Sequence, residues 1–113
     1  MSEFLFYFGF TWPEEVRFVD EHPEADLGEA SAAVLVTASN EEDALEMGEE
    51  LAERFVECLY GERAYSWREG RFARWLESDV KALLEARRRR LPVCRGAEGI
   101  AGAVKDMVRF YDA

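Results

Sequence analysis

The chain has 113 residues, of which 49% are hydrophobic and 13% aromatic, and its formal net charge at pH 7 is -10. This length and composition predict one folded domain over residues 1–113 and exclude a disordered chain. No apolar run is long enough to span a membrane, and the apolar N-terminal segment lacks a basic leader and a cleavage site. We therefore expect a cytoplasmic protein that does not contact a membrane.

Residues 3–10 predict the first strand, in which four alternating phenylalanines share one face while Leu5 and Tyr7 share the other. Residues 12–21 begin with a helix-start pattern and predict a short helix, although their alternation also fits a strand. Residues 30–38 predict a second strand, which is again apolar on both faces. Strands of this kind have to be covered on both faces.

The rest of the chain predicts three helices and two further strands. Residues 39–61 carry the clearest helical pattern, with Ser39 or Asn40 as the cap and carboxylates in the first turn. Residues 63–69 predict a third strand, and residues 71–91 predict a second amphipathic helix that a proline ends. Residues 92–94 predict a short edge strand, and residues 97–111 predict a third helix.

This order of elements predicts a two-layer α+β sandwich, with about three helices packed on one face of a three- or four-stranded, mostly antiparallel sheet. Because strands and helices alternate after residue 30, a small α/β fold with parallel crossovers is the alternative. The predicted core draws apolar residues from most of these elements: Phe4, Phe6, Val34, Val36, Leu51, Phe55, Leu76, Leu83, Val104 and Val108.

The second face of the predicted sheet is apolar too, and soluble monomers rarely expose such a patch. We therefore expect a homodimer that buries this face, since a symmetric dimer covers a patch with the same patch of its partner. In a monomer, residues 12–21 could fold across the face instead.

The charge is distributed unevenly, because residues 1–62 hold 17 Asp/Glu and 2 Lys/Arg whereas residues 63–113 hold 7 Asp/Glu and 12 Lys/Arg. On a helical wheel Arg87 and Arg90, from a run of four arginines, point along the buried face. Either the helix ends near residue 87, or both side chains reach carboxylates or an anionic ligand beyond the core. The run is interpreted as a solvated helix end, as a partner for the acidic half, or as a nucleic-acid contact, which the net charge disfavours.

Two further segments are candidate sites. Asp20, His22 and Glu24 lie in an acidic loop that could hold a divalent metal or supply a general base, or could simply be exposed. Arg95 and Gly96 begin a glycine-containing turn before the last helix, where backbone amides could bind a phosphate. The same glycines could instead permit close helix packing.

The use of cysteine and histidine limits the chemistry further. With only Cys58, Cys94 and His22, neither a disulfide framework nor a zinc site is expected, and both thiols should be reduced. No spacing matches a catalytic or cofactor motif, so no cofactor is expected. The sequence therefore predicts a non-catalytic protein-interaction or self-associating domain. The alternatives are a small-molecule or phosphate-binding protein or enzyme with a site near residues 87–99, and nucleic-acid binding through the arginine-rich helix end.

Overall fold

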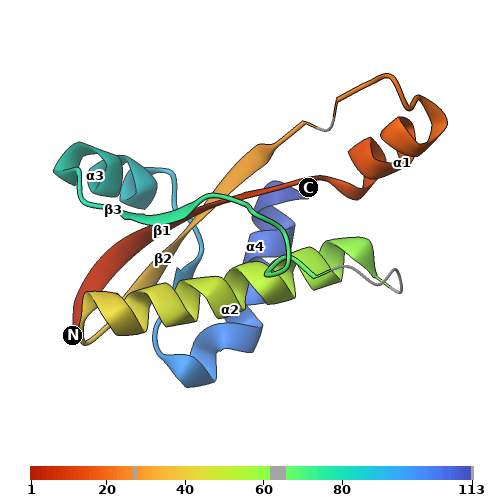
Figure 1. Ribbon diagram of the computed structural model, residues 1–113. Coiled ribbons are helices and arrows are strands. Elements are labelled where there is room, and N and C mark those ends of the chain that lie inside the picture. Colours follow the sequence, from red (N-terminus) through yellow and green to blue (C-terminus); the bar gives the residue numbers. More distant parts are fainter. Residues whose placement is uncertain (27, 62–65, 113) are drawn as a thin grey trace.

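The computed structural model describes residues 1–26, 28–61 and 66–112 (Figure 1). The elements in these residues are, in chain order, β1 Ser2–Phe10, α1 Pro13–Glu21, β2 Ala30–Ala38, α2 Glu41–Tyr60, β3 Arg74–Glu77, α3 Val80–Arg88, β4 Val93–Cys94, the 3₁₀ turn η1 Ala97–Gly99 and α4 Ile100–Tyr111. None of the helices in the described ranges combines the length and the apolar character that a membrane span requires.

The strands form one mixed sheet with the order β3-β1-β2-β4 (Figure 1). β1 lies between two antiparallel neighbours and pairs with β2 along its whole length. β4 pairs with β2 in parallel. The expected α+β class with a mostly antiparallel sheet is confirmed, and so is the short strand before the last helix.

The first face of the sheet carries the main core. Phe6, Phe8 and Phe10 are buried on β1 in one cluster with residues of α2 and α4. Phe8 meets Phe55 of α2 edge to face, with ring centroids 5.9 Å apart, an arrangement that aromatic pairs favour. Gly48 of α2 faces Phe6 so closely that a Cβ at this position would overlap the ring. The missing side chain therefore sets the distance between α2 and the sheet.

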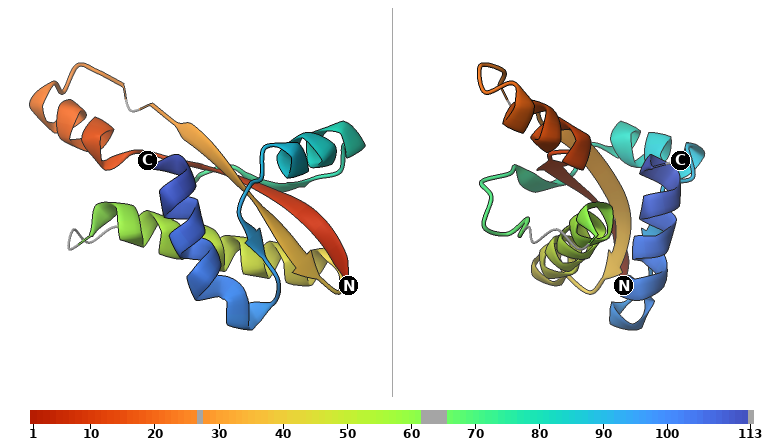
Figure 2. Two further views of the ribbon diagram at one scale, coloured as in Figure 1. Left: turned by 180° about the vertical axis from the view of Figure 1, so that it is seen from behind. Right: turned by 90° about the vertical axis from the view of Figure 1, so that its right-hand side faces the viewer.

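The second face of the sheet is covered from within the chain. Leu5 and Leu35 are buried there by Ala86 of α3 and by Leu91 just after it. α3 therefore lies on the opposite side of the sheet from α2 (Figure 2), whereas the sequence predicts all helices on one side. The apolar face that leads us to expect a dimer is thus largely covered by α3, and residues 12–21 do not cover it.

Most of the predicted core is confirmed. The buried members are Phe6, Val34, Val36, Leu51, Phe55 and Val104. The other members are half-buried and pack at the margins of the two clusters: Phe4, Leu76, Leu83 and Val108.

The region between α2 and β4 differs from the prediction. Residues 66–69, the described part of the predicted third strand, contain a turn, and residues 63–65 lie outside the described residues. The predicted helix over residues 71–91 is instead β3 followed by α3. Asp79 separates the two elements, because its carboxylate accepts a hydrogen bond from the backbone N–H of Lys81 at 3.0 Å and caps α3.

Trp67 explains why a strand-like pattern forms a turn. Its side chain is fully buried beside Phe8, and its indole N–H donates to the carbonyl oxygen of Gly9 at 2.8 Å. The guanidinium of Arg74 lies over the indole ring, with Cζ 4.1 Å from the ring centroid. Burial of one large side chain, rather than strand pairing, therefore positions this segment.

The last helix completes one edge of the sheet. β4 pairs only with Leu35 and Val36 of β2. Beside this pair, the Tyr111 hydroxyl accepts a hydrogen bond from the Ala33 N–H at 2.8 Å and donates one to the Ala33 carbonyl at 2.9 Å. Burial raises the pKa of Tyr111, so the hydroxyl keeps its proton at neutral pH. The side chain thus satisfies the backbone of β2 where β4 ends.

α1 touches these layers near its start, where Val16 packs against the first core cluster. It projects beyond the ends of β1 and β2 in all three views (Figures 1 and 2), and Pro13 at its start is the residue that it buries. The predicted short helix over residues 12–21 is therefore confirmed.

Candidate functional site

The arginine run at the end of α3 is divided among different contacts. Arg87 forms an ion pair with Glu3 of β1, with 2.7 Å between Nε and Oε1. Arg88 pairs with Glu85 at 2.8 Å, and this hydrogen bond lowers the pKa of the Glu85 carboxyl. Exposed pairs of this kind contribute little to stability. Arg87 thus partners a carboxylate of the acidic half, while Arg88 behaves as part of a solvated helix end.

Arg90 ends α3 in a conformation that arginine rarely adopts. Its φ is 56°, in the left-handed region, and no other non-glycine residue in the described ranges has a positive φ. The backbone N–H of Arg90 donates to the carbonyl of Arg87 at 3.1 Å. The next N–H, of Leu91, donates to the carbonyl of Ala86 at 3.1 Å. This is the Schellman helix end, whose left-handed position is usually glycine because glycine avoids the steric cost.

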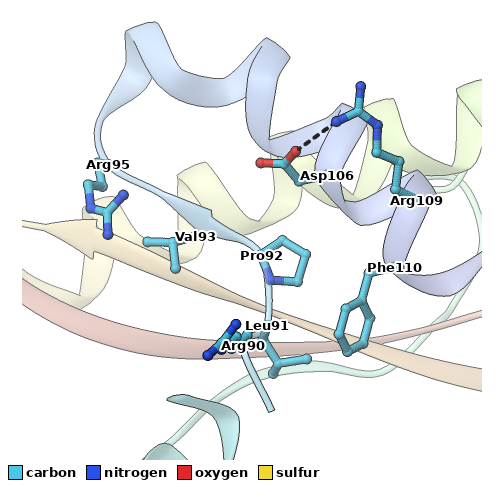
Figure 3. A pocket seen from close by; sticks show the side chains of 8 residues that line it. All are labelled: Arg90, Leu91, Pro92, Val93, Arg95, Asp106, Arg109 and Phe110. Carbon is cyan, nitrogen blue, oxygen red and sulfur yellow. Dashed lines mark ion pairs between the residues drawn. The ribbon is translucent and has the colours of Figure 1, made fainter. Parts of the chain in front are cut away.

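The Arg90 side chain lines a groove between β4 and α4 (Figure 3). The groove is shallow and largely open to solvent, with a volume of about 420 Å³, and its lining consists of Arg90, Leu91, Pro92, Val93, Arg95, Asp106, Arg109 and Phe110. Figure 3 shows Arg90 and Arg95 at the two ends of the β4 segment, whereas the last three residues project from α4 on the other side. The apolar side chains of Pro92, Val93 and Phe110 lie between these charges.

The groove is basic although the protein as a whole is acidic. Neither Arg90 nor Arg95 has an ion-pair partner in the part of the chain that the structure describes. Arg109 and Asp106 are 3.8 Å apart on the exposed face of α4, which is a loose pair. Unpaired guanidinium groups beside an apolar surface can bind an anion that has an apolar part.

The structure brings together two of the four predicted anion contacts. Arg90 and Arg95 line the groove, whereas Arg87 is held by its ion pair with β1. Gly96 lines a different cavity of about 290 Å³, whose lining includes two carboxylates of α2. These carboxylates would repel an anion beside Gly96.

The glycine turn before α4 has a backbone role at one position. The φ of Gly96 is 112°, which side-chain-bearing residues rarely adopt. A Cβ at Gly99 or Gly102 would meet no atom of another described element within 4 Å, so these glycines do not allow a close approach to such an element. Cys94 before the turn is buried, which raises the pKa of its thiol, and its Sγ donates to the Gly96 carbonyl at 3.3 Å. A buried protonated thiol is a poor nucleophile.

The predicted acidic site lies at the end of α1 and in the loop that follows it. Asp20 lies in the last turn of α1 rather than in the predicted loop, whereas His22 and Glu24 follow the helix, and all three are exposed. The His22 ring stacks on Phe18 with centroids 4.3 Å apart, and its Nδ1 donates to the Phe18 carbonyl at 3.0 Å. No three His, Cys, Asp or Glu side chains within the described ranges are grouped so that they could hold a metal ion. The imidazole helps to end α1 through its hydrogen bond to the Phe18 carbonyl.

Three residues of the groove carry no sequence signal for a site. Asp106 and Arg109 lie on the polar side of a predicted amphipathic helix, where charges at this spacing are common, and Phe110 reads as an ordinary apolar residue. Only the packing of α4 beside β4 brings them next to Arg90. No local sequence pattern indicates that residues 90–95 and residues 106–110 lie side by side.

The lining of the groove contains no histidine, cysteine or serine. The comparisons with known proteins add no relative: no protein-family model, curated protein or solved structure matches this chain.

Proposed function

We propose that the protein is a non-catalytic interaction domain that binds a basic protein partner through residues 13–29, the acidic arm. The observation that carries the proposal is the position of α1, which projects beyond the sheet and leaves the Phe18 side chain 53% exposed (Figures 1 and 2). Aromatic side chains supply much of the binding energy when a partner removes them from water.

The charge of the acidic arm favours a basic partner. Residues 13–29 hold seven Asp/Glu and one Arg. That arginine, Arg17, lies 3.9 Å from Glu14 in an exposed pair, so it neutralises little of the charge. A surface of one sign attracts a partner of the other sign and speeds the encounter.

The base of the acidic arm is anchored to the body of the protein. The Thr11 hydroxyl donates to the carbonyl of Gly28 at 3.3 Å, and the Tyr60 hydroxyl donates to the carbonyl of Thr11 at 2.6 Å. Thr11 itself is buried. These contacts anchor both ends of the acidic arm to the body of the protein. A surface that is preorganised in this way loses less conformational entropy on binding.

Selection of short random peptides displayed on phage tests this proposal. We expect the selected peptides to be basic, and their binding to weaken as salt screens the exposed charges. Phe18→Ser should weaken binding at least tenfold, because it removes the aromatic contact. Leu84→Ser, a matched change of an exposed apolar residue on α3, should leave binding unchanged. Selected peptides without basic charge, or equal binding to the Phe18→Ser variant, would contradict the proposal.

The setting and the class of partner are part of the same proposal. Cys58 is exposed and Cys94 buried, and both are free thiols, which supports a reducing cytoplasmic setting. Nucleic acid is the partner that we favour least. Arg87 and Arg88 are paired with carboxylates of the protein, and the net charge of -10 opposes a phosphate backbone.

Self-association is the second candidate function, and exposed apolar side chains favour it. Trp75 lies on the edge strand β3, stacks on Tyr7 with ring centroids 5.3 Å apart and remains exposed. Val80 and Leu84 are exposed on α3. Sedimentation should then detect a species of twice the 13.0 kDa chain mass that Leu84→Glu converts to the monomer. A 13.0 kDa species at every accessible concentration would rule out this candidate.

A further inference from the structure

We infer that the groove between β4 and α4 is a binding site for a small phosphate monoester that carries a planar organic group. The residues that line the groove belong to segments 90–95 and 106–110. None of them lies in the acidic arm, so the inference is independent of the proposed protein partner.

The first support is the backbone of Arg90. At a helix end of this type glycine is the residue that folding favours, yet an arginine stands at the left-handed position. Local strain of this kind is found at binding sites, where the strained residue serves a ligand. The residue with this φ of 56° also lines the groove (Figure 3).

The second support is the pair of guanidinium groups at the β4 side of the groove. Arg90 and Arg95 flank β4, and neither has an ion-pair partner among the residues that the structure describes. Because the two arginines stand at the two ends of the β4 segment, one of them can contact the phosphate while the charge of the other adds to the positive potential of the groove, which favours a doubly negative phosphate monoester over a singly negative carboxylate. The planar guanidinium fork also matches the geometry of phosphate oxygens.

The third support is the apolar surface next to these charges. Pro92 is buried, whereas Val93 and Phe110 are partly exposed and belong to the second core cluster. A planar ring bound beside the phosphate can pack on the exposed parts of Val93 and Phe110, although the Arg89 guanidinium already lies over the Phe110 ring, with Cζ 5.8 Å from its centroid. The volume of about 420 Å³ is in the range of sites for small organic ligands.

The α4 side of the groove gives the ligand an orientation. Asp106 would repel a phosphate there, but its carboxylate can accept hydrogen bonds from hydroxyl or amino groups of the organic part. Arg109 forms a loose ion pair with Asp106 at 3.8 Å. A nucleoside monophosphate has these features in this order, because its phosphate is joined through hydroxyl-bearing ribose to a planar base.

Binding measured by isothermal titration with AMP as the probe tests the inference. Adenosine and inorganic phosphate serve as the two halves of that probe, and a short glutamate-rich peptide serves as a competing anion. We expect AMP to bind at least tenfold more tightly than either half or the peptide, because only AMP engages both the arginines and the apolar surface.

Variants of this chain assign the binding to the groove. Arg90→Gly removes the guanidinium and at the same time relieves the backbone, so the variant should stay folded while its affinity for AMP falls at least tenfold. Arg95→Ala should cause a similar loss of affinity. Arg88→Ala is the matched control, since Arg88 pairs with Glu85 outside the groove and its replacement should leave the affinity unchanged.

The opposite outcomes overturn the inference. AMP binding that is no tighter than adenosine binding would show that the arginines do not hold the phosphate. Equal losses in Arg90→Gly and Arg88→Ala would place the anion elsewhere, and tighter binding of the glutamate-rich peptide would assign the groove to acidic protein segments. Phe18→Ser should not affect AMP binding, so failure of this inference and failure of the acidic-arm proposal are distinguishable.

Discussion

Replacement of Arg90 by glycine should make the protein more stable. Arg90 holds the left-handed position at the end of α3, with φ at 56°. Glycine adopts this conformation without a clash between a Cβ and the following carbonyl. Because Arg90 has no ion-pair partner within the described residues, the substitution removes strain without breaking a salt bridge.

The size of the gain follows from two opposing terms. The left-handed conformation costs a residue with a side chain about 1–2 kcal/mol. The greater freedom of glycine in the unfolded chain offsets about 0.5–1 kcal/mol of this. The free energy of unfolding should therefore rise by about 0.5–1 kcal/mol, which corresponds to an increase in Tm of roughly 2–4 °C for a chain of this length.

Urea unfolding of the wild type and two glycine variants measures this effect. Arg88→Gly is the matched control, because Arg88 is the last helical residue of α3. Glycine in a helical position destabilises by about 1 kcal/mol, so this variant should move in the opposite direction. If Arg90→Gly were as unstable as Arg88→Gly, the reasoning from the left-handed backbone would be refuted.

Three further predictions concern the core and the sheet edge. Gly48→Ala should lower the free energy of unfolding by about 1–2 kcal/mol, because the new Cβ overlaps the Phe6 ring. This loss should exceed the gain from the better helix propensity of alanine. A gain in stability would show that α2 can move away from the sheet. Leu51→Ala should destabilise by about 2–5 kcal/mol in urea unfolding, since Leu51 is fully buried, and a loss below about 1 kcal/mol would mean that the first core cluster rearranges. Tyr111→Phe should cost about 1–3 kcal/mol at neutral pH, because the Ala33 N–H loses its acceptor. Burial raises the pKa of Tyr111 above its ordinary value of 10.0, so the native state keeps the hydroxyl proton to higher pH than the unfolded chain does. The free energy of unfolding of the wild type should therefore fall as pH rises above 10.0. An equally steep fall with pH in the Tyr111→Phe variant would contradict this.

Elements whose residue pattern fits only one type of secondary structure could be predicted from the sequence. Residues 3–10 and 30–38 are apolar on both faces and lie in the nine-residue strands β1 and β2, and residues 41–60 keep one apolar stripe over twenty residues. The start of that helix is also local information, because the Asn40 side chain accepts a hydrogen bond from the Asp43 N–H at 2.8 Å.

Residues 71–91 could not be assigned because two periodicities coincide there. Phe72 and Leu76 are four residues apart, which fits a helix, but they are also an even number apart and so share one face of a strand. In the structure both pack against the first core cluster, while Trp75 lies exposed on the other side with Tyr7. Pairing of β3 with β1 decides between the two patterns, and this pairing is a tertiary contact.

The candidate groove could be predicted only in part for a similar reason. The sequence singles out Arg90 and Arg95 because they are basic and close to a turn. It does not reveal that Arg90 adopts a left-handed backbone, because arginine is not the residue that such a position favours. The contribution of α4 depends on its packing beside β4, which is not a local property.

The hydroxyl of Tyr111 has a consequence for how the protein behaves at high concentration. β4 protects only a short part of the outer edge of β2, and an unprotected edge is a template on which strands of other molecules can add and aggregate. Tyr111 occupies both hydrogen-bonding groups of Ala33 on that edge. Loss of the last turn of α4, by proteolysis for instance, would therefore expose a backbone template next to an apolar strand. We therefore expect the Tyr111 side chain, in the last turn of α4, to limit aggregation of the folded protein.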